Sequence, residues 1–497
     1  MFTMYRKNVW IVLLFSLILS ISFQGSRGLY DFDETRYAEV AREMLLTGDY
    51  LVPQRDFHPH LAKPPFTYWM IAISMKILGI NEWAVRLPNA LFFTLTSFLV
   101  ALIGQNLWDK KTGILSGLIY ATTLLPYVAS NIVTTDTILV FWETVAVFAF
   151  LKGYLAQSPR EAKRWFTLMW LFWGFGFLTK GVAIGPPVAG LFLFWIIKRK
   201  EFKALPITLL GSLLFFSIGF AWYIWIALQI KGSLSIFLKE QIIGRLFKDI
   251  YHRNGAWYAP FYLYLPLLIL GVFPWSITWP IIFHSFKEKK WFFWEVILRP
   301  KLLFLFLWFN VPLFIFWFAK SRLPLYILPL FAPLVLITTR GIQEIYEKRE
   351  SSFVKFLMSK QFFIIWAIIL LVLKFLASFV PAPQDARYYS RKFAPYLANA
   401  HCFLALDQPY YDGMAFYTGI DWEYLPAKGT EDASYIEDTW ENEAEELKRI
   451  TKKCLILVRG DKLLHLKDRL NNLGLAFQSL DKWGKISLYE ISLQKTK

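Results

Sequence analysis

The polar segment from residue 30 to residue 44 carries the side chains best suited to chemistry in this chain. It reads YDFDETRYAEVAREM and contains five acids and two arginines. Helical spacing of its apolar residues from residue 33 onward predicts an amphipathic surface helix with Asp33 or Glu34 in its first turn. A positioned carboxylate can act as a general base, so both acids are candidate catalytic residues. The alternative is that these acids only form ion pairs along the helix, with Arg36 and Arg42 as partners.

Lys63 is a second candidate, because two prolines follow it and hold the backbone extended. An ammonium group presented at a defined point suits a phosphate. His58 and His60 could share a metal ion, but a proline separates them and no third ligand lies nearby. We therefore predict no metal site, although a divalent metal stays compatible with the sequence.

Further ionisable residues occur near the ends of apolar stretches, where charge is costly and tends to mark a site. They are Asp136, Lys180, Arg245, His252, Lys320 and Arg322. The alternative for each is that the side chain reaches out to the membrane interface. Acids and cations gathered on one side of a membrane could hold the phosphate of a lipid while a carboxylate acts on a sugar or hydroxyl. We find no nucleotide-binding glycine loop, so the donor is predicted to be lipid-borne.

Long apolar runs must position these residues. Of the 497 residues 56% are hydrophobic and 18% charged, which argues against a water-soluble enzyme and against a disordered chain. The sequence predicts an α-helical polytopic membrane protein with about 11 to 13 transmembrane helices, and 165–197 forms one long or two short elements. The eleven runs are 9–24, 85–106, 113–130, 137–151, 165–178, 182–197, 204–230, 261–283, 302–318, 323–339 and 361–380.

The distribution of basic residues predicts the orientation. If the first run is a retained helix rather than a signal peptide, the inside segments hold 22 Lys and Arg against 8 Asp and Glu. This places the N-terminus in the cytoplasm and the loops 25–84 and 231–260 outside. The net charge of +17 is then mainly a topology signal, and no nucleic-acid partner is predicted.

The tail, residues 381–497, has ordinary soluble patterning and is predicted to be a small extracytoplasmic α/β domain after a membrane domain at 1–380. Cys402 and Cys454 each begin a predicted strand. They could form a disulfide if those strands are neighbours, or remain two buried thiols. The predicted strands are 402–406 and 454–459, and the predicted helices are 440–453 and 462–473.

Several motifs together resemble the lipid A aminoarabinose transferase family. That family belongs with the protein O-mannosyltransferases in the C-type (GT-C) superfamily of integral membrane glycosyltransferases. The likeness covers most of residues 25–340 in order. The matching stretches are DETRYAEVAREM (33–44), GDYLVP (48–53), KPPFTYW (63–69), TTD (134–136), FLTKG (177–181) and SRLPLYILP (321–329).

The resemblance implies transfer of a sugar, 4-amino-4-deoxy-L-arabinose, from undecaprenyl phosphate to lipid A with inversion at the anomeric carbon. It implies the periplasmic face of the bacterial inner membrane, membrane lipids as surroundings, and a link to polymyxin resistance. By the same resemblance Asp33 is the essential acid and Asp136 a second acid of the cavity. The residues that it places around the donor phosphate are Arg36, Tyr37, Lys63, Lys180 and Tyr326.

The sequence also departs from the family pattern. Ala62 stands where the lipid A enzymes often have an acid before the Lys-Pro-Pro motif, which weakens any metal site there. The segment 231–260 matches only loosely, through residues that include Arg245 and His252. These two residues, Lys320 and Arg322 complete the candidate phosphate ligands.

Two other functions fit the same pattern. Within the class, the protein could be a protein O-mannosyltransferase or a transferase for another envelope glycan. From a different class, a transporter or flippase of lipid-linked sugar would also place charges in a lipid-facing cavity. Inverted repeats would favour the transporter, and the two halves of the sequence differ in loop length instead.

Overall fold

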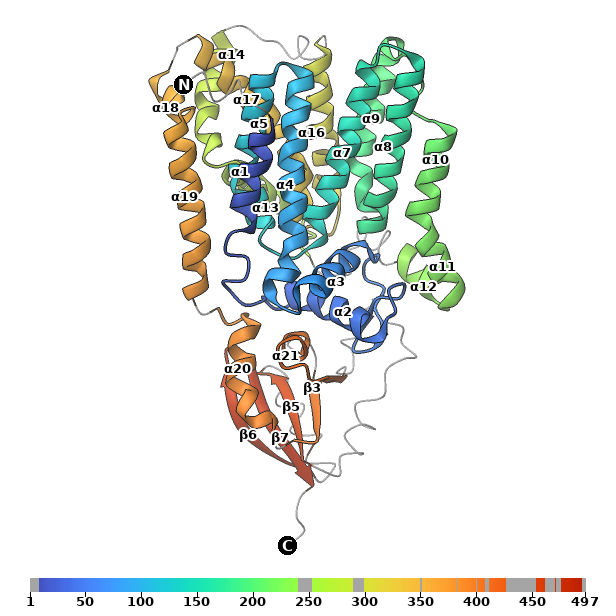
Figure 1. Cartoon of the computed structure of the whole chain (residues 1–497), viewed down its shortest axis with the longest axis vertical. Coiled ribbons are helices and arrows are strands. Elements are labelled where there is room, and N and C mark those ends of the chain that lie inside the picture. Colours follow the sequence, from blue (N-terminus) through green and yellow to red (C-terminus); the bar gives the residue numbers. More distant parts are fainter. Residues whose placement is uncertain are drawn as a thin grey trace. The chain divides into compact units, whose positions relative to one another are not determined.

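The computed structural model divides the chain into two compact units (Figure 1). Met1–Ser22 and Arg86–Leu373 form the helical unit, and Phe23–Val85 and Lys374–Lys497 form the mixed unit. The predicted first loop thus folds in the same unit as the C-terminal segment, while the predicted boundary at residue 380 stays a prediction. The structure describes residues 9–239, 253–288, 299–348, 351–380, 382–398, 400–406, 411–425, 453–460, 470 and 475–493.

Each of the eleven predicted apolar runs falls mainly on helix. The α-helices on these runs are α1 (Trp10–Ile21), α4 (Glu82–Leu107), α5 (Lys110–Thr122), α6 (Leu124–Ala129), α7 (Thr135–Leu155), α8 (Pro159–Lys180), α9 (Gly185–Lys198), α10 (Leu209–Phe215), α11 (Ala221–Gln229), α13 (Ala259–Gly271), α14 (Trp279–Glu288), α16 (Pro300–Phe318), α17 (Phe331–Glu347) and α19 (Lys360–Leu376). The short helices α12 (Ser233–Ser235) and α18 (Ser352–Leu357) and the tighter or wider turns η1 (Gly181–Ile184), η2 (Arg199–Glu201), η3 (Phe216–Phe220), η5 (Trp275–Thr278), η6 (Pro324–Leu330) and η7 (Ala377–Phe379) connect them.

The described residues contain seven helical stretches that are long and apolar enough to cross a membrane. The pair of helices Ala259–Gly271 and Trp275–His284, bent by 88°, adds an eighth if it forms one span. One of the seven, Pro159–Glu201, reverses direction within its length. The evidence is that the rings of Trp173 and Phe192 lie 6.0 Å apart. A straight helix would separate these residues by about 28 Å. The protein is therefore a multi-pass membrane protein, and 165–197 forms two short elements rather than one long one.

Helices α7 and α8 form an antiparallel pair that positions the candidate site of the helical unit (Figure 1). Ring contacts show the direction, since Trp142 lies 4.8 Å from Phe175 and Phe150 lies 6.0 Å from Phe166. Close packing requires Gly153, where an added Cβ would approach the Phe166 ring to 2.3 Å. The start of α7 and the end of α8 therefore lie at the same end of the pair.

The mixed unit combines the first loop with a five-stranded sheet. Its first part contains α2 (Glu34–Thr47), β1 (Gln54–Arg55), β2 (His58–Pro59) and α3 (Phe66–Leu78), and its second part contains α20 (Ala386–Leu397), β3 (Cys402–Leu406), α21 (Tyr411–Thr418), β4 (Glu423–Leu425), β5 (Cys454–Arg459), β6 (Leu475–Trp483) and β7 (Ile486–Leu493). The strand order is β4-β3-β5-β7-β6. Strands β4, β3 and β5 are parallel, whereas β5, β7 and β6 pair antiparallel.

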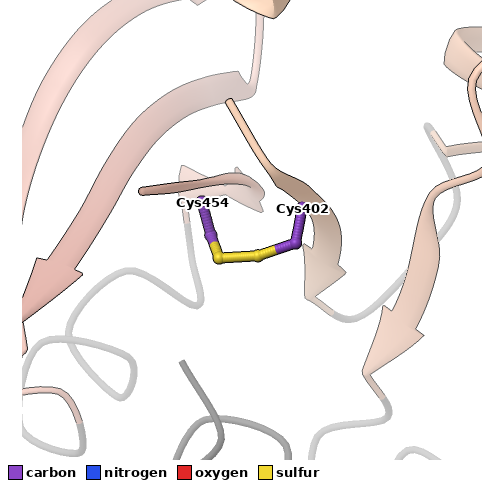
Figure 2. The surroundings of a disulfide bond; sticks show 2 residues. All are labelled: Cys402 and Cys454. Carbon is purple, nitrogen blue, oxygen red and sulfur yellow. A yellow bond between two sulfur atoms is a disulfide. The ribbon is translucent and has the colours of Figure 1, made fainter. Parts of the chain in front are cut away.

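The two predicted strands of the tail are confirmed as β3 and β5, and they are neighbours in the sheet. Cys402 and Cys454 stand opposite each other in the register, with Cα atoms 4.6 Å apart. A disulfide joins them (Figure 2). Of the two alternatives that the sequence leaves open, the structure contains the disulfide and not the two thiols. The predicted helices at 440–453 and 462–473 fall largely outside the described residues.

Buried polar contacts join the two sequence-distant parts of the mixed unit. Arg55 of β1 donates two hydrogen bonds to the carboxylate of Asp412 in α21, at 2.7 and 2.9 Å, and both side chains are fully buried. Gly28 approaches Asp385 so closely that an added Cβ would lie 1.9 Å from its carboxylate. That carboxylate accepts hydrogen bonds from the backbone N–H groups of Gly28 and Arg387.

We predict that Asp412→Ala destabilises the protein by about 3–5 kcal/mol, because it removes the carboxylate that neutralises the buried Arg55 charge. The matched control is Asp421→Ala, which removes an ion pair to Arg42 whose acid is 55% exposed and should cost about 1 kcal/mol or less. Denaturant unfolding of the detergent-solubilised protein, followed by tryptophan fluorescence, measures both. Equal losses for the two variants would contradict this account of the buried pair.

Candidate functional site

Asp33 is presented by a strained backbone at the start of α2. Phe32, the preceding residue, adopts a left-handed conformation with φ of 79°, which is unfavourable for a bulky side chain. The Asp33 side chain is 61% exposed and accepts a hydrogen bond from the Arg36 guanidinium at 2.7 Å. The helix predicted from this point is confirmed, and it ends at Gly48, whose φ of 71° provides a left-handed C-cap.

Glu34, the other candidate acid of this segment, has a different environment. Its side chain is buried, forms a 2.6 Å ion pair with Arg27, and accepts a hydrogen bond from the backbone N–H of Tyr30 at 3.0 Å. These bonds close the loop that leads into α2. The Glu34 carboxylate thus supports the segment, while the neighbouring Asp33 carboxylate remains open to solvent.

Arg36, the ion-pair partner of Asp33, lies beside a pair of tyrosine rings in the mixed unit. The Arg36 guanidinium lies 5.6 Å from the centre of the Tyr37 ring, and Tyr37 lies 5.4 Å from the Tyr68 ring. Burial acts to lower the pKa of Arg36, but Asp33 and Tyr37 raise it and the net shift is upward. Arg36 is therefore a fixed cation. Lys63 is partly buried just before α3.

The other acids of this segment are buried, and burial raises the pKa of Asp31, Glu39 and Glu43. The pKa of Glu39 rises to about 7 even though Arg42 donates three hydrogen bonds to its carboxylate. Asp31 accepts hydrogen bonds from the hydroxyls of Tyr389 and Thr35. These acids hold the segment in place through bonds inside the unit.

Three predicted residues meet in the helical unit. Asp136 lies in the first turn of α7 and Lys180 is the last residue of α8, and the Lys180 ammonium lies 2.5 Å from the Asp136 carboxylate. Both side chains are almost buried, at 12% and 7% exposed. The same ammonium lies 4.9 Å from the ring centre of Tyr326 in η6. The antiparallel pairing of α7 and α8 thus brings together motifs that are 44 residues apart.

The remaining predicted phosphate ligands are placed differently. The buried Arg322 guanidinium donates hydrogen bonds to the backbone carbonyls of Asn254, Ala256 and Trp317 at 2.7–2.9 Å. It therefore joins two segments of the helical unit. Lys320 is exposed. Arg245 and His252 lie outside the described residues.

Sequence reasoning missed Glu143, two turns beyond Asp136 on the same face of α7. Its side chain is 2% exposed, and within the described part of the chain neither carboxylate oxygen has a hydrogen-bond partner. The signal was available, because Glu143 is the only acid in the apolar run 137–151.

No group of three or more His, Cys, Asp or Glu side chains in the described ranges is placed to hold a metal ion. The His58 ring lies 2.6 Å from the backbone carbonyl of Asp56, and the His60 side chain is fully buried.

The fold is that of the C-type membrane glycosyltransferases. The crystal structure of ArnT from Cupriavidus metallidurans bound to undecaprenyl phosphate matches with a TM-score of 0.78, 17% identity and 97% of each chain covered. The oligosaccharyltransferase of Archaeoglobus fulgidus in its apo form matches more distantly, with a TM-score of 0.52, 10% identity, and 91% of this chain and 70% of that chain covered.

The sequence comparisons give the particular family. Residues 62–244 match the family described as dolichyl-phosphate-mannose-protein mannosyltransferase. The undecaprenyl phosphate-alpha-4-amino-4-deoxy-L-arabinose arabinosyl transferases of Enterobacter sp. (strain 638) and Pectobacterium atrosepticum are each 34% identical, over 66% and 68% of this chain. The matched region spans 59% of the length of each of these relatives. The chain belongs to the C-type glycosyltransferase family that contains the aminoarabinose transferases and the protein mannosyltransferases.

The buried acids of the mixed unit predict that stability falls as pH rises. The native state binds more protons than the unfolded state between the ordinary carboxyl pKa and about 7, because burial raises the pKa of Glu39. We expect the melting temperature in detergent to be higher at pH 5.5 than at pH 8, with Glu39 contributing about 2 kcal/mol over this interval. Glu39→Gln should reduce this slope, whereas Asp33→Asn, which changes an exposed acid, should not. A melting temperature that increases from pH 5.5 to pH 8 would contradict the raised pKa of Glu39.

Proposed function

We propose that the protein is an inverting glycosyltransferase that moves 4-amino-4-deoxy-L-arabinose from undecaprenyl phosphate to lipid A. The observation that carries this proposal is the buried pair of Lys180 and Asp136 beside Tyr326, in a chain related to transferases that are named for this donor. A cation kept at membrane depth by an acid suits the phosphate of a lipid carrier.

In the proposed reaction, an oxygen of the acceptor attacks the anomeric carbon of the sugar from the face opposite the phosphate. The bond from that carbon to the phosphate oxygen breaks, and undecaprenyl phosphate leaves with the bonding electrons. Lys180 stabilises the negative charge that develops on this phosphate, because its ammonium is already desolvated and held in place. The family resemblance assigns the same role to Arg36, Tyr37 and Lys63 of the mixed unit.

Asp33 is the proposed acid on the acceptor side. It is exposed, and only Arg36 forms an ion pair with it among the described residues, whereas Glu34 is bound by Arg27 and the Tyr30 backbone. If the acceptor is a hydroxyl, the Asp33 carboxylate takes its proton. If the acceptor is a phosphate of lipid A, the attacking oxygen is already anionic and Asp33 orients the reacting groups.

The proposed location is the bacterial inner membrane, with the N-terminus in the cytoplasm and the first loop and the C-terminal segment in the periplasm. The excess of basic residues in the predicted inside loops supports this orientation. The disulfide between Cys402 and Cys454 also supports it, because disulfides persist in oxidising compartments such as the periplasm.

A protein acceptor is the second candidate, and the match of residues 62–244 to the mannosyltransferase family favours it. The donor chemistry would be the same, since both readings use a sugar on a polyprenyl phosphate. The difference lies in the acceptor, which would be a Ser or Thr hydroxyl, with Asp33 as the base that removes its proton.

We predict that the purified protein transfers radiolabelled aminoarabinose from undecaprenyl phosphate to lipid A. In Asp33→Asn the rate should fall by roughly 100-fold or more, because a positioned carboxylate is lost. A Ser/Thr peptide offered with the undecaprenyl-phosphate sugar tests the second candidate. Transfer that survives undiminished in Asp33→Asn would overturn the catalytic assignment, and movement of the lipid without transfer would indicate a flippase.

Lys180→Gln combined with Asp136→Asn tests the phosphate assignment without leaving a buried charge unpaired. We expect kcat/KM for the donor to fall roughly 10- to 100-fold, because a charge-assisted hydrogen bond to phosphate is lost. Arg340→Gln is the matched control, since it removes a partly buried ion pair to Glu344 within α17. An unchanged kcat/KM in the double variant would remove Lys180 from the donor site.

A further inference from the structure

Glu143 has no role in the proposed reaction, although it is an acid buried within an apolar helix. It lies within the apolar helix α7, is 2% exposed, and both of its carboxylate oxygens lack a hydrogen-bond partner among the described residues. An acid at membrane depth is costly and is typically found where it serves a function. A protonated acid that merely fills the helix packing is the alternative, and the effect of a variant on two different donors distinguishes the two.

Glu143 faces the same cluster as the candidate phosphate site. It follows Asp136 by seven residues, which places it about 10 Å further along the same face of α7. Lys180, Asp136 and the Tyr120 hydroxyl of α5 are the titratable groups that interact with it electrostatically in the described part of the chain. Lys180 is already paired with Asp136 at 2.5 Å. The cluster thus holds two acids and one cation, and the acid without a direct partner is Glu143.

We propose that Glu143 binds the cationic amino group of the donor sugar. This inference rests on the proposed function and adds to it the group that selects the sugar. A buried carboxylate is stable in its charged form only beside a cation with good hydrogen-bond geometry. The donor brings such a cation, because its sugar carries an amino group while its phosphate is bound by Lys180. Glu143 then pairs with the ammonium at one end of the sugar, and Lys180 pairs with the phosphate at the other.

The assignment makes Glu143 a specificity residue. A site built to pair with an ammonium group rejects a sugar that lacks it, because the carboxylate is then left buried and unpaired. A neutral sugar or an N-formylated amino sugar should therefore be a poor donor for the native protein. Removal of the charge at residue 143 should weaken this discrimination, whereas a purely structural role would affect all donors alike.

The test compares two donors, undecaprenyl phosphate carrying 4-amino-4-deoxy-L-arabinose and the same lipid with the amino group formylated. In Glu143→Gln we expect kcat/KM for the amino donor to fall roughly 10- to 100-fold. The kcat/KM for the formylated donor should stay constant or rise. The ratio of kcat/KM for the amino donor to that for the formylated donor should therefore fall by at least the same factor. The matched control is Thr144→Val, because Thr144 is the next buried residue of α7 and its hydroxyl donates to the Val140 carbonyl within the same helix.

Each outcome decides the proposal. Loss of both donors to the same extent in Glu143→Gln, or no change in their ratio, overturns it. If Glu143→Gln fails to fold, Glu143→Asp keeps the charge, and it must retain the preference for the amino donor or the proposal is wrong. A native protein that transfers a neutral sugar and no amino sugar contradicts the proposed function itself, which separates that failure from a failure of the Glu143 assignment.

Discussion

Burial of a charged group away from water is the constraint on which this structure depends, because such a group needs a partner or a purpose. In the helical unit the constraint acts at the ends of α7 and α8, where Asp136 and Lys180 are both almost fully buried and neutralise each other at 2.5 Å. The packing of the two helices is what brings them together. A lysine kept charged in this way is a ready ligand for a phosphate, because most of its desolvation cost has been met during folding.

The same constraint shapes the mixed unit in a different way. Most ionisable groups of the first loop are used inside the unit: Arg55 binds Asp412, Arg42 binds Glu39 and Asp421, and Arg27 binds Glu34. The acids of α2 thus mainly form ion pairs within the first loop, and Arg42 also pairs with an acid of the C-terminal segment. Asp33 stands out against this background because it is exposed. Its exposure, rather than the number of acids in the motif, is the reason why we propose Asp33 as the reactive carboxylate.

Local features of the fold could be predicted from the sequence, and long-range pairings could not. The apolar runs, the start of α2 at Glu34 and the strands β3 and β5 follow from hydrophobic length and periodicity, which are local properties. The pair of Arg55 and Asp412 joins residues 357 positions apart, and no local pattern indicates it.

Charge type alone does not show what an individual residue contacts. Arg322, a predicted phosphate ligand, is a cation beside an apolar run, and the structure shows that its guanidinium donates hydrogen bonds to three backbone carbonyls. No sequence pattern indicates such carbonyl contacts. Glu143 is a buried acid that the sequence analysis did not single out. One acid hardly lowers the mean hydropathy of the run 137–151, so the run still reads as apolar. An acid is rare in such a run, and that rarity indicates a functional residue.

The strained residue before Asp33 links the C-terminal segment to the proposed chemistry. A left-handed Phe32 persists only if its surroundings fix the backbone, and the bonds on its N-terminal side do so. The Asp31 backbone N–H donates to the Gln384 carbonyl, and the Asp31 carboxylate accepts from the Tyr389 hydroxyl. Both partners lie more than 350 residues along the chain from Asp31, in the C-terminal part of the same unit. The C-terminal segment therefore helps to fix the backbone that presents Asp33, and changes around residues 384–389 would alter the direction of the Asp33 carboxylate without touching the motif.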